Sequence, residues 1–171
     1  MLIVSDTTPI LSLLKAGRLG LLPRLFGAVV IPKAVYNELV RNPGYAGEAE
    51  EVEQSDFLKV FDLSDRRTVE ELLQKEGLDE GESEAIALAE ERRADVLLMD
   101  ERRGRRVAEK RGIRMTGTIG LLLHAYDEGI LSGAEIMECL ECLRENNIRM
   151  GKSLYAAVQY HLRHSGQISG Q

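Results

Sequence analysis

The sequence predicts an α/β fold with a largely parallel β-sheet. Short apolar runs typical of strands, at residues 2–4, 28–31 and 95–99, alternate with longer segments of helical periodicity. The uninterrupted apolar run at 28–31 indicates a strand covered on both faces, as in parallel sheets flanked by helices. The length of 171 residues fits one domain, which we expect over residues 1–165, followed by a flexible tail at 166–171.

Composition argues against several classes of protein. The net charge of -6 is unlike that of a protein that coats nucleic acid by bulk attraction. No apolar run approaches the ~20 residues of a membrane span, and no basic leader precedes the first strand, so we expect a soluble, cytoplasmic protein with no membrane contact. Cys139 and Cys142 are interpreted as small residues on a helix face rather than zinc ligands, because no second pair accompanies them.

The first half of the chain is predicted to alternate strands and helices. Asp6 follows the first strand, and Thr8 is predicted to cap a helix that has Pro9 in its first position. Residues 42–54 are polar and acidic, and we expect a loop or lid that contains a short helix. The other elements of this half are predicted at residues 18–26 (helix), 28–31 (strand), 33–40 (helix), 57–61 (edge strand) and 64–74 (helix).

The second half is organised around the stretch from Leu78 to Arg106. It reads as a helix that begins with acids, a turn at 92–94, a buried strand that ends at Asp100, and an arginine-rich helix. The elements predicted after it are a strand at 114–116 and helices at 117–126, 132–144 and 153–164. The last helices are a candidate face for a homodimer.

Asp6 and Asp100 each follow a predicted strand. Ligands bind at the carboxyl ends of the strands in open α/β sheets, so we expect these two carboxylates to lie side by side. Paired carboxylates repel unless one keeps a proton or a cation lies between them, and Mg²⁺ or Mn²⁺ is the ordinary partner of such oxygens. Glu38 lies beside the buried stripe of its helix, whereas Glu82 is also explained by a capping box with Asp79.

Basic residues cluster directly after Asp100. They are Arg102, Arg103, Arg105, Arg106, Lys110, Arg111 and Arg114. A local basic patch on an acidic protein can hold a phosphate backbone, but a solvated helix face with Glu109 as partner explains the cluster equally well. The hydroxyl of Thr8, beside a helix N-terminus, is suited to a phosphate oxygen as well as to capping.

The segments VSDTTPI, IPKAVYNEL, GESEAIALA and LLMDERRGRR, taken in this order, resemble a PIN domain of the VapC-like type. The likeness extends over nearly the whole chain, including GTIGLLL and the C-terminal helices, which are similar to a subgroup described only as predicted nucleic-acid-binding. It implies a three-layer α/β/α sandwich with a central parallel sheet of four or five strands, plus C-terminal helices. It also implies an acidic site of Asp6, Glu38, Glu82 and Asp100. The family usually has aspartate at the third position, so Glu84 and Asp79 stay open as substitutes.

The resemblance implies an endoribonuclease that cuts single-stranded RNA with Mg²⁺ or Mn²⁺, and whose relatives include toxins neutralised by an antitoxin. In this hypothesis Asp6 and Asp100 bind the ion, Glu38 and Glu82 complete its shell, and Thr8, Arg102, Arg103 and Arg106 hold the RNA. One alternative is a non-catalytic module that binds RNA or protein. Another is phosphotransfer through an aspartyl-phosphate, for which the sequence lacks a second aspartate two residues after Asp6.

Overall fold

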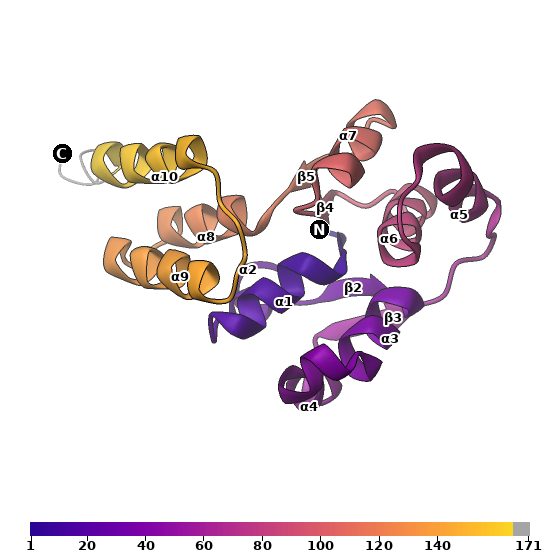
Figure 1. Ribbon diagram of the computed structural model, residues 1–171, viewed down its shortest axis with the longest axis horizontal. Helices are drawn as coiled ribbons and strands as arrows, with labels where there is room; N and C mark the ends of the chain where they lie inside the picture. Colours follow the sequence, from indigo (N-terminus) through magenta and orange to yellow (C-terminus); the bar gives the residue numbers. More distant parts are fainter. Residues whose placement is uncertain (166–171) are drawn as a thin grey trace. The chain divides into compact units, whose positions relative to one another are not determined.

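The computed structural model describes residues 1–165 (Figure 1). The predicted flexible tail at 166–171 lies outside the described residues. The chain forms two compact units, the first Met1–Thr118 and the second from Ile119 onward. One domain spanning 1–165 therefore stays a prediction.

A five-stranded parallel sheet forms the centre of the first unit, in the order β3-β2-β1-β4-β5. The strands are β1 (Ile3–Ser5), β2 (Val29–Pro32), β3 (Leu58–Phe61), β4 (Val96–Leu98) and β5 (Met115–Thr116). Every pairing between neighbouring strands is parallel. The predicted parallel sheet is confirmed, and β3 lies at an edge, as its alternating pattern predicts.

Helices connect the strands of the first unit. They are α1 (Thr7–Lys15), α2 (Leu21–Phe26), α3 (Lys33–Arg41), the 3₁₀ turn η1 (Pro43–Tyr45), α4 (Ala46–Gln54), α5 (Arg67–Glu71), the π-helical turn η2 (Leu72–Glu76), α6 (Glu80–Glu91) and α7 (Arg102–Lys110). The chain moves one way across the sheet from β1 to β3 and the other way from β3 to β5. Right-handed crossovers then place α1 to α4 on one face and α5 to α7 on the other, which is an α/β/α sandwich (Figure 1).

The face under α6 and α7 shows how the sequence selects this packing. Val4, Val30 and Leu97 project from neighbouring strands into one buried cluster with residues of α6 and α7. The strand side chains come from three adjacent strands, and the helix side chains of the cluster include Ile86, Leu88 and Val107. Burying this continuous apolar surface is what holds α6 and α7, and the acids they carry, against the sheet.

The second unit is helical. It contains α8 (Thr118–Asp127) from Ile119 onward, α9 (Gly133–Glu145) and α10 (Lys152–Ser165). Ser132 and Glu135 form a capping box that fixes the start of α9. In the part of the chain that the structure describes, no helix is both long and apolar enough to cross a membrane.

Two local predictions are wrong. Helix α1 begins two residues earlier than predicted, with Asp6 rather than Thr8 as its N-cap, and no side-chain hydrogen bond caps it. Residues 46–54 are a helix packed against α3 rather than a lid, and Glu48 forms an ion pair with Lys15 of α1. The acidic composition of this segment reflects its exposed face, not disorder.

Substitution of Gly104 tests how closely α7 packs on the sheet. A Cβ at Gly104 would overlap the sulfur of Met99, which is fully buried in the core. We expect Gly104→Ala to lower the free energy of unfolding by about 1–3 kcal/mol, because the core must repack around the added methyl. Urea denaturation monitored by circular dichroism measures the change.

Gly47→Ala is the matched control, because a Cβ at Gly47 in α4 meets no atom within 4 Å. This variant should be neutral or more stable by up to about 1 kcal/mol, since alanine favours helix. Equal stability of the two variants would contradict the close packing of α7 on Met99.

Candidate functional site

A small cavity of about 480 Å³ opens at the carboxyl end of β1. Its lining carries five carboxylates and one guanidinium: Asp6, Glu38, Asp79, Glu82, Glu101 and Arg103. These residues come from the end of β1, from α3, from the start of α6 and from the start of α7. We call this space the acid cavity. Its location agrees with the rule that ligands bind at the carboxyl ends of parallel strands.

Asp6 is the most enclosed of these acids, with 3% of its surface exposed. Burial raises its pKa from 3.8 to about 7, because the ionised form loses its contact with water. The carboxylates of Asp79, Glu82 and Glu38 raise this pKa further, and a hydrogen bond from the Thr7 backbone lowers it. Asp6 is therefore partly protonated near neutral pH when no cation is present.

Three carboxylates converge on Gly81, in the first turn of α6. A Cβ at Gly81 would lie 3.3 Å from Glu38 Oε2, 3.5 Å from Asp79 Oδ1 and 3.6 Å from Asp6 Oδ1. A side chain at this position would enter the space between the acids. The glycine thus lets α1, α3 and α6 bring their acids to one point.

The capping box at the start of α6 orients Asp79 and Glu82. Asp79 Oδ1 accepts a hydrogen bond from the Glu82 backbone at 2.8 Å, and Glu82 Oε2 accepts one from the Asp79 backbone at 3.0 Å. The predicted capping box is confirmed. Burial raises the pKa of Glu82, and Asp79 and Glu101 raise it further. Capping and lining the cavity are compatible roles, because each carboxylate uses only one of its oxygens in the box.

Glu38 is held by the start of α1. Thr7 Oγ1 donates a hydrogen bond of 2.7 Å to Glu38 Oε2. This bond links the residue after Asp6 to the middle of α3, so the two acids keep a fixed relation. Sequence periodicity predicted Glu38 at the edge of a buried stripe, and it lies beside the buried Leu39 and the buried Val35.

Asp100 is not among the residues that line the acid cavity, and its expected place beside Asp6 stays a prediction. In the register of β1 and β4, Ser5 pairs with Leu98, and the Asp6 backbone donates to Leu98 O at 3.0 Å. Continued by one residue, this register places Asp6 opposite Met99, and Asp100 follows one residue later. Since successive side chains of an extended segment point to opposite sides, this register favours opposite sides for the Asp6 and Asp100 side chains.

The Asp100 carboxylate is occupied by Thr118. Its Oδ1 accepts from the Thr118 backbone at 2.7 Å and its Oδ2 accepts from the Thr118 hydroxyl at 2.6 Å. These bonds satisfy the first turn of α8. A catalytic or metal-binding role for Asp100 stays a prediction.

Glu101 is the acid that sequence reasoning missed. It is the N-cap of α7, lines the acid cavity and raises the pKa of Glu82. The signal in the sequence was its adjacency to Asp100. Two consecutive acids after a strand point to opposite sides of the sheet. The register of this strand with β1 decides which of the two is directed toward the side of Asp6.

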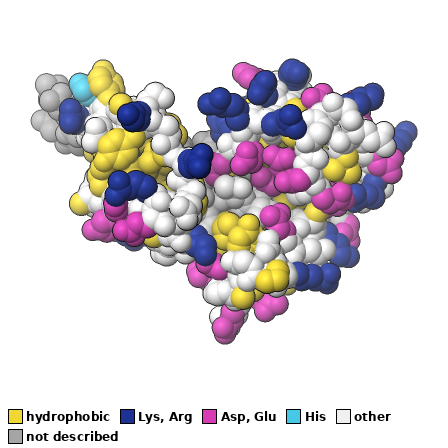
Figure 2. Space-filling view, viewed as in Figure 1, with side chains coloured by type: hydrophobic (Ala, Val, Ile, Leu, Met, Phe, Trp, Pro, Cys, Tyr) yellow, Lys and Arg dark blue, Asp and Glu magenta, His cyan; other side chains and the backbone are white. Residues whose placement is uncertain are grey.

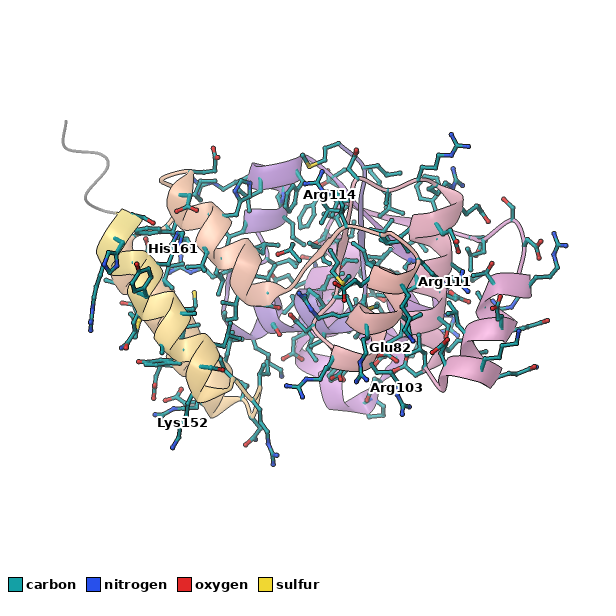
Figure 3. All side chains as sticks on the ribbon, turned by 90° about the horizontal axis from the view of Figure 1, so that it is seen from above. Glu82, Arg103, Arg111, Arg114, Lys152 and His161 are labelled. Atoms are coloured by element: carbon teal, nitrogen blue, oxygen red, sulfur yellow. The ribbon has the colours of Figure 1, made fainter. Side chains whose placement is uncertain are left out.

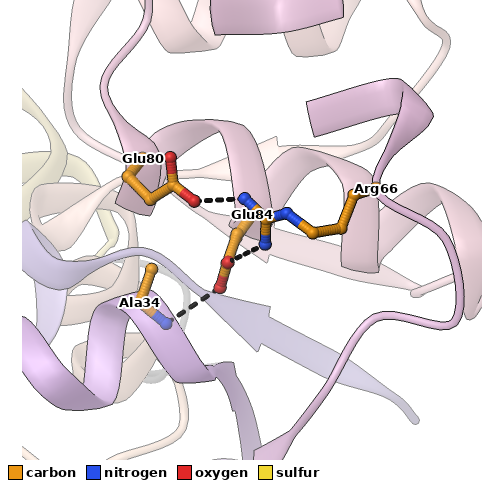
Figure 4. A network of polar contacts seen from close by, with 4 residues as sticks. All are labelled: Ala34, Arg66, Glu80 and Glu84. Atoms are coloured by element: carbon orange, nitrogen blue, oxygen red, sulfur yellow. Dashed lines mark hydrogen bonds and ion pairs between the residues drawn. The ribbon is translucent and has the colours of Figure 1, made fainter. Parts of the chain in front are cut away.

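Glu84, one of the open substitutes for the third acid, has another role (Figure 4). Its Oε2 accepts from the Ala34 backbone at 2.8 Å and its Oε1 pairs with Arg66 at 2.7 Å. Arg66 also pairs with Glu80, and both partners raise the pKa of its guanidinium. Glu84 thereby ties α6 to the start of α3. Asp79, the other substitute, lines the acid cavity.

The predicted RNA-binding residues divide between two cavities. Thr8 and Arg103 line the acid cavity, where Arg103 and Glu82 extend next to each other from α7 and α6 (Figure 3). Arg103 also donates a hydrogen bond of 3.1 Å to Gly77 O. Arg102 and Arg106 line a separate cavity with Asp100. In Figure 2 a band of Asp and Glu side chains crosses the first unit, and Lys and Arg side chains gather above it over α7.

The acids of this cavity suit a hard divalent cation in their donor chemistry. All are carboxylates, and one of them is buried enough to hold a proton near neutral pH in the absence of a counter-ion. Among residues 1–165, no group of three or more Asp, Glu, His or Cys side chains is placed so that it could hold a metal ion as it stands. Mg²⁺ usually keeps several waters and takes one or two carboxylates, so a complete set is not required.

Comparison with known proteins assigns a family to most of the chain. A family model described as a PIN domain matches residues 2–163. The match spans both compact units. Neither the search of curated proteins nor the search of solved structures found a match.

The raised pKa of Asp6 predicts how stability depends on pH. Above pH 3.8 the unfolded chain ionises Asp6, whereas the folded protein keeps the proton until about pH 7. Stability is therefore lost as the pH rises through this window. Asp6→Asn, which has no charge to bury, should match the wild type at pH 4 and exceed it by ~4 kcal/mol at pH 8.

Urea unfolding of both proteins in a chelator, at intervals between pH 4 and pH 8, measures this difference. If the difference in free energy of unfolding between the two proteins stays constant with pH, burial of the Asp6 charge does not destabilise the folded protein.

Proposed function

The chain belongs to the PIN-domain family, and on that premise we propose that it is a divalent-cation-dependent endoribonuclease acting on single-stranded RNA. The observation that carries the proposal is the convergence of Asp6, Glu38 and Asp79 on Gly81. Of these three acids, Asp6 is buried, Glu38 is partly buried and Asp79 is exposed. A buried carboxylate with two others beside it is costly to keep ionised without a cation. Hydrolysis of a phosphodiester bond is a reaction that such a cation assists.

Asp6, Glu38 and Glu82 would hold the cation, with Asp79 and Glu101 close enough to take part. When bound, a divalent cation lowers the pKa of water and offsets the charge that develops on the phosphate oxygens. The pKa of Asp6 is raised chiefly by burial, so a cation held beside it would favour the ionised carboxylate. Glu82 has a raised pKa and lies at the cavity wall, so it is suited to accept a proton from the attacking water.

Arg103 and Thr8 would position the substrate. Arg103 lines the acid cavity and presents a guanidinium, which matches a phosphate by two parallel hydrogen bonds. Thr8 lies in the first turn of α1 beside Asp6, where a hydroxyl can bind a phosphate oxygen. A single strand is the substrate proposed, because the cavity is small and lined by side chains rather than shaped to a duplex.

The VapC-like resemblance extends the proposal to partners. On this basis the protein is a toxin that a cognate antitoxin neutralises, and it forms a homodimer in the cell. The antitoxin rests on the family resemblance and the homodimer on the C-terminal helices as a candidate face, whereas the cleavage chemistry rests also on the acid cavity.

Cleavage assays with matched variants test the proposal. We expect the wild type to cut a mixed pool of labelled single-stranded RNA in Mn²⁺ or Mg²⁺, and not in chelator. Asp6→Asn and Glu82→Gln should each reduce the rate by at least ~100-fold, because each removes a group from the reacting centre.

Glu84→Gln is the matched control, because Glu84 lies two residues from Glu82 but binds Ala34 and Arg66. It should lower stability and leave the rate of the folded protein within a few-fold of the wild type. Cleavage that survives Asp6→Asn would overturn the assignment. RNA binding without any cleavage by the wild type would favour a non-catalytic module.

A further inference from the structure

A second cavity lies on the other side of the segment that links β4 to α7. Its volume is about 640 Å³, and its charged lining consists of Arg102, Arg105, Arg106, Asp100 and Glu109. Residues of β5 and the turn before it complete the wall. We call it the arginine cavity. It has no residue in common with the acid cavity.

Arg102 and Arg106 have no charge partner in the described part of the chain. They lie one turn apart on α7, and both are exposed. Other arginines of this acidic protein are paired, such as Arg111 with Glu90 and Arg66 with Glu84. Two adjacent guanidiniums that face a cavity without a carboxylate partner repel each other, and an anion between them would relieve that repulsion.

The arginines in the lining outnumber the acids, with three guanidiniums against the carboxylates of Asp100 and Glu109. Both oxygens of Asp100 accept hydrogen bonds from Thr118. Glu109 lies three residues after Arg106 on the same helix, but it forms no ion pair with Arg106 among the described residues and is exposed. The cavity thus presents a net positive surface although the chain has a net charge of -6.

Arg105 is already fixed in place. It is partly buried, and its Nη1 donates a hydrogen bond of 2.8 Å to Met99 O. A side chain held by the backbone loses less conformational entropy when it binds a ligand. Arg105 therefore provides a preorganised donor group beside the two exposed ones.

The remaining wall of the cavity is apolar. Ile113 and Met115 line it and pack against the core cluster. An inorganic anion has no use for an apolar wall, whereas a ribose or a base does. Single-stranded nucleic acids combine phosphates that bind arginine with flat bases that stack on apolar or guanidinium surfaces.

We propose that the arginine cavity is a phosphate and nucleoside subsite for a single strand of RNA, held by Arg102, Arg105 and Arg106 against Ile113 and Met115. The proposal rests on the proposed function and adds a second binding point to it. Arg103, one residue from Arg102, lines the acid cavity, so the first turn of α7 separates the two cavities. A strand that crosses this turn would place one phosphate in the arginine cavity and another beside Asp6.

Binding of RNA to an uncleaving protein tests the subsite. The background is Asp6→Asn in chelator, and the probe is a fluorescent single-stranded RNA oligonucleotide whose dissociation constant is measured by anisotropy over a range of salt concentrations. Arg102→Gln with Arg106→Gln should weaken binding by ~10-fold or more at low salt. It should also reduce the slope of log K against log salt by about 0.7 for each phosphate that the two arginines bind.

Arg24→Gln with Arg41→Gln removes the same charge from α2 and from the end of α3, and is the matched control. Both control residues are exposed and lie outside the two cavities. If both double variants weaken RNA binding equally, the effect comes from net charge alone, and the proposed subsite is overturned. Unchanged binding by Arg102→Gln with Arg106→Gln would overturn it as well. Unfolding midpoints of both variants show that each is folded.

The phosphate bound in the arginine cavity could belong to an RNA strand or to a free nucleotide. Competition by adenosine monophosphate distinguishes the two. If the strand spans both cavities, the mononucleotide should compete only at concentrations at least ~100-fold above those at which unlabelled RNA competes. Equal competition would identify a free-nucleotide site and overturn the RNA-strand proposal. Failure of the subsite and failure of the nuclease are distinguishable, because this assay needs no cleavage and the cleavage assay leaves Arg102 and Arg106 intact.

Discussion

The burial of Asp6 among other carboxylates is the constraint on which the site depends. Asp6 is nearly inaccessible to water, and its pKa is raised to about 7 by burial and by Asp79, Glu82 and Glu38. The fold overcomes this cost with specific contacts: Thr7 binds Glu38, and the capping box binds Asp79 and Glu82. An apolar residue at position 6 could fill the same space without the cost of burying a charge. A buried carboxylate with a raised pKa is therefore a sign of function.

The acids are supported by contacts that lie outside the cavity. Glu84 joins α6 to the first turn of α3 through Ala34, and Arg66 joins the segment before α5 to α6 through Glu84 and Glu80. These bonds fix the relation between the helix that carries Glu38 and the helix that carries Glu82. Met99 and Gly104 fix α7 in the same way, since the absence of a side chain at Gly104 lets α7 approach the sheet.

The sequence was sufficient for the sheet and for three of the acids. Apolar runs predicted the strands, and the resemblance to PIN domains implied that Asp6, Glu38 and Glu82 would meet. It was insufficient for Asp100, because the side on which a strand-end residue projects depends on the register of β1 with β4, a non-local property. The same one-residue alternation hid Glu101, and the helical turn of α7 divides Arg103 from Arg102.

Anomalous diffraction from a crystal grown with Mn²⁺ is the most direct test of the central claim, which is that the acids of the cavity converge because they share a cation. The account predicts a Mn²⁺ peak in the acid cavity, with Asp6 and at least one of Glu38 and Glu82 bound directly or through water at the distances usual for oxygen ligands. A peak bound by Asp100 and not by Asp6, or no peak in the acid cavity at millimolar Mn²⁺, would contradict it.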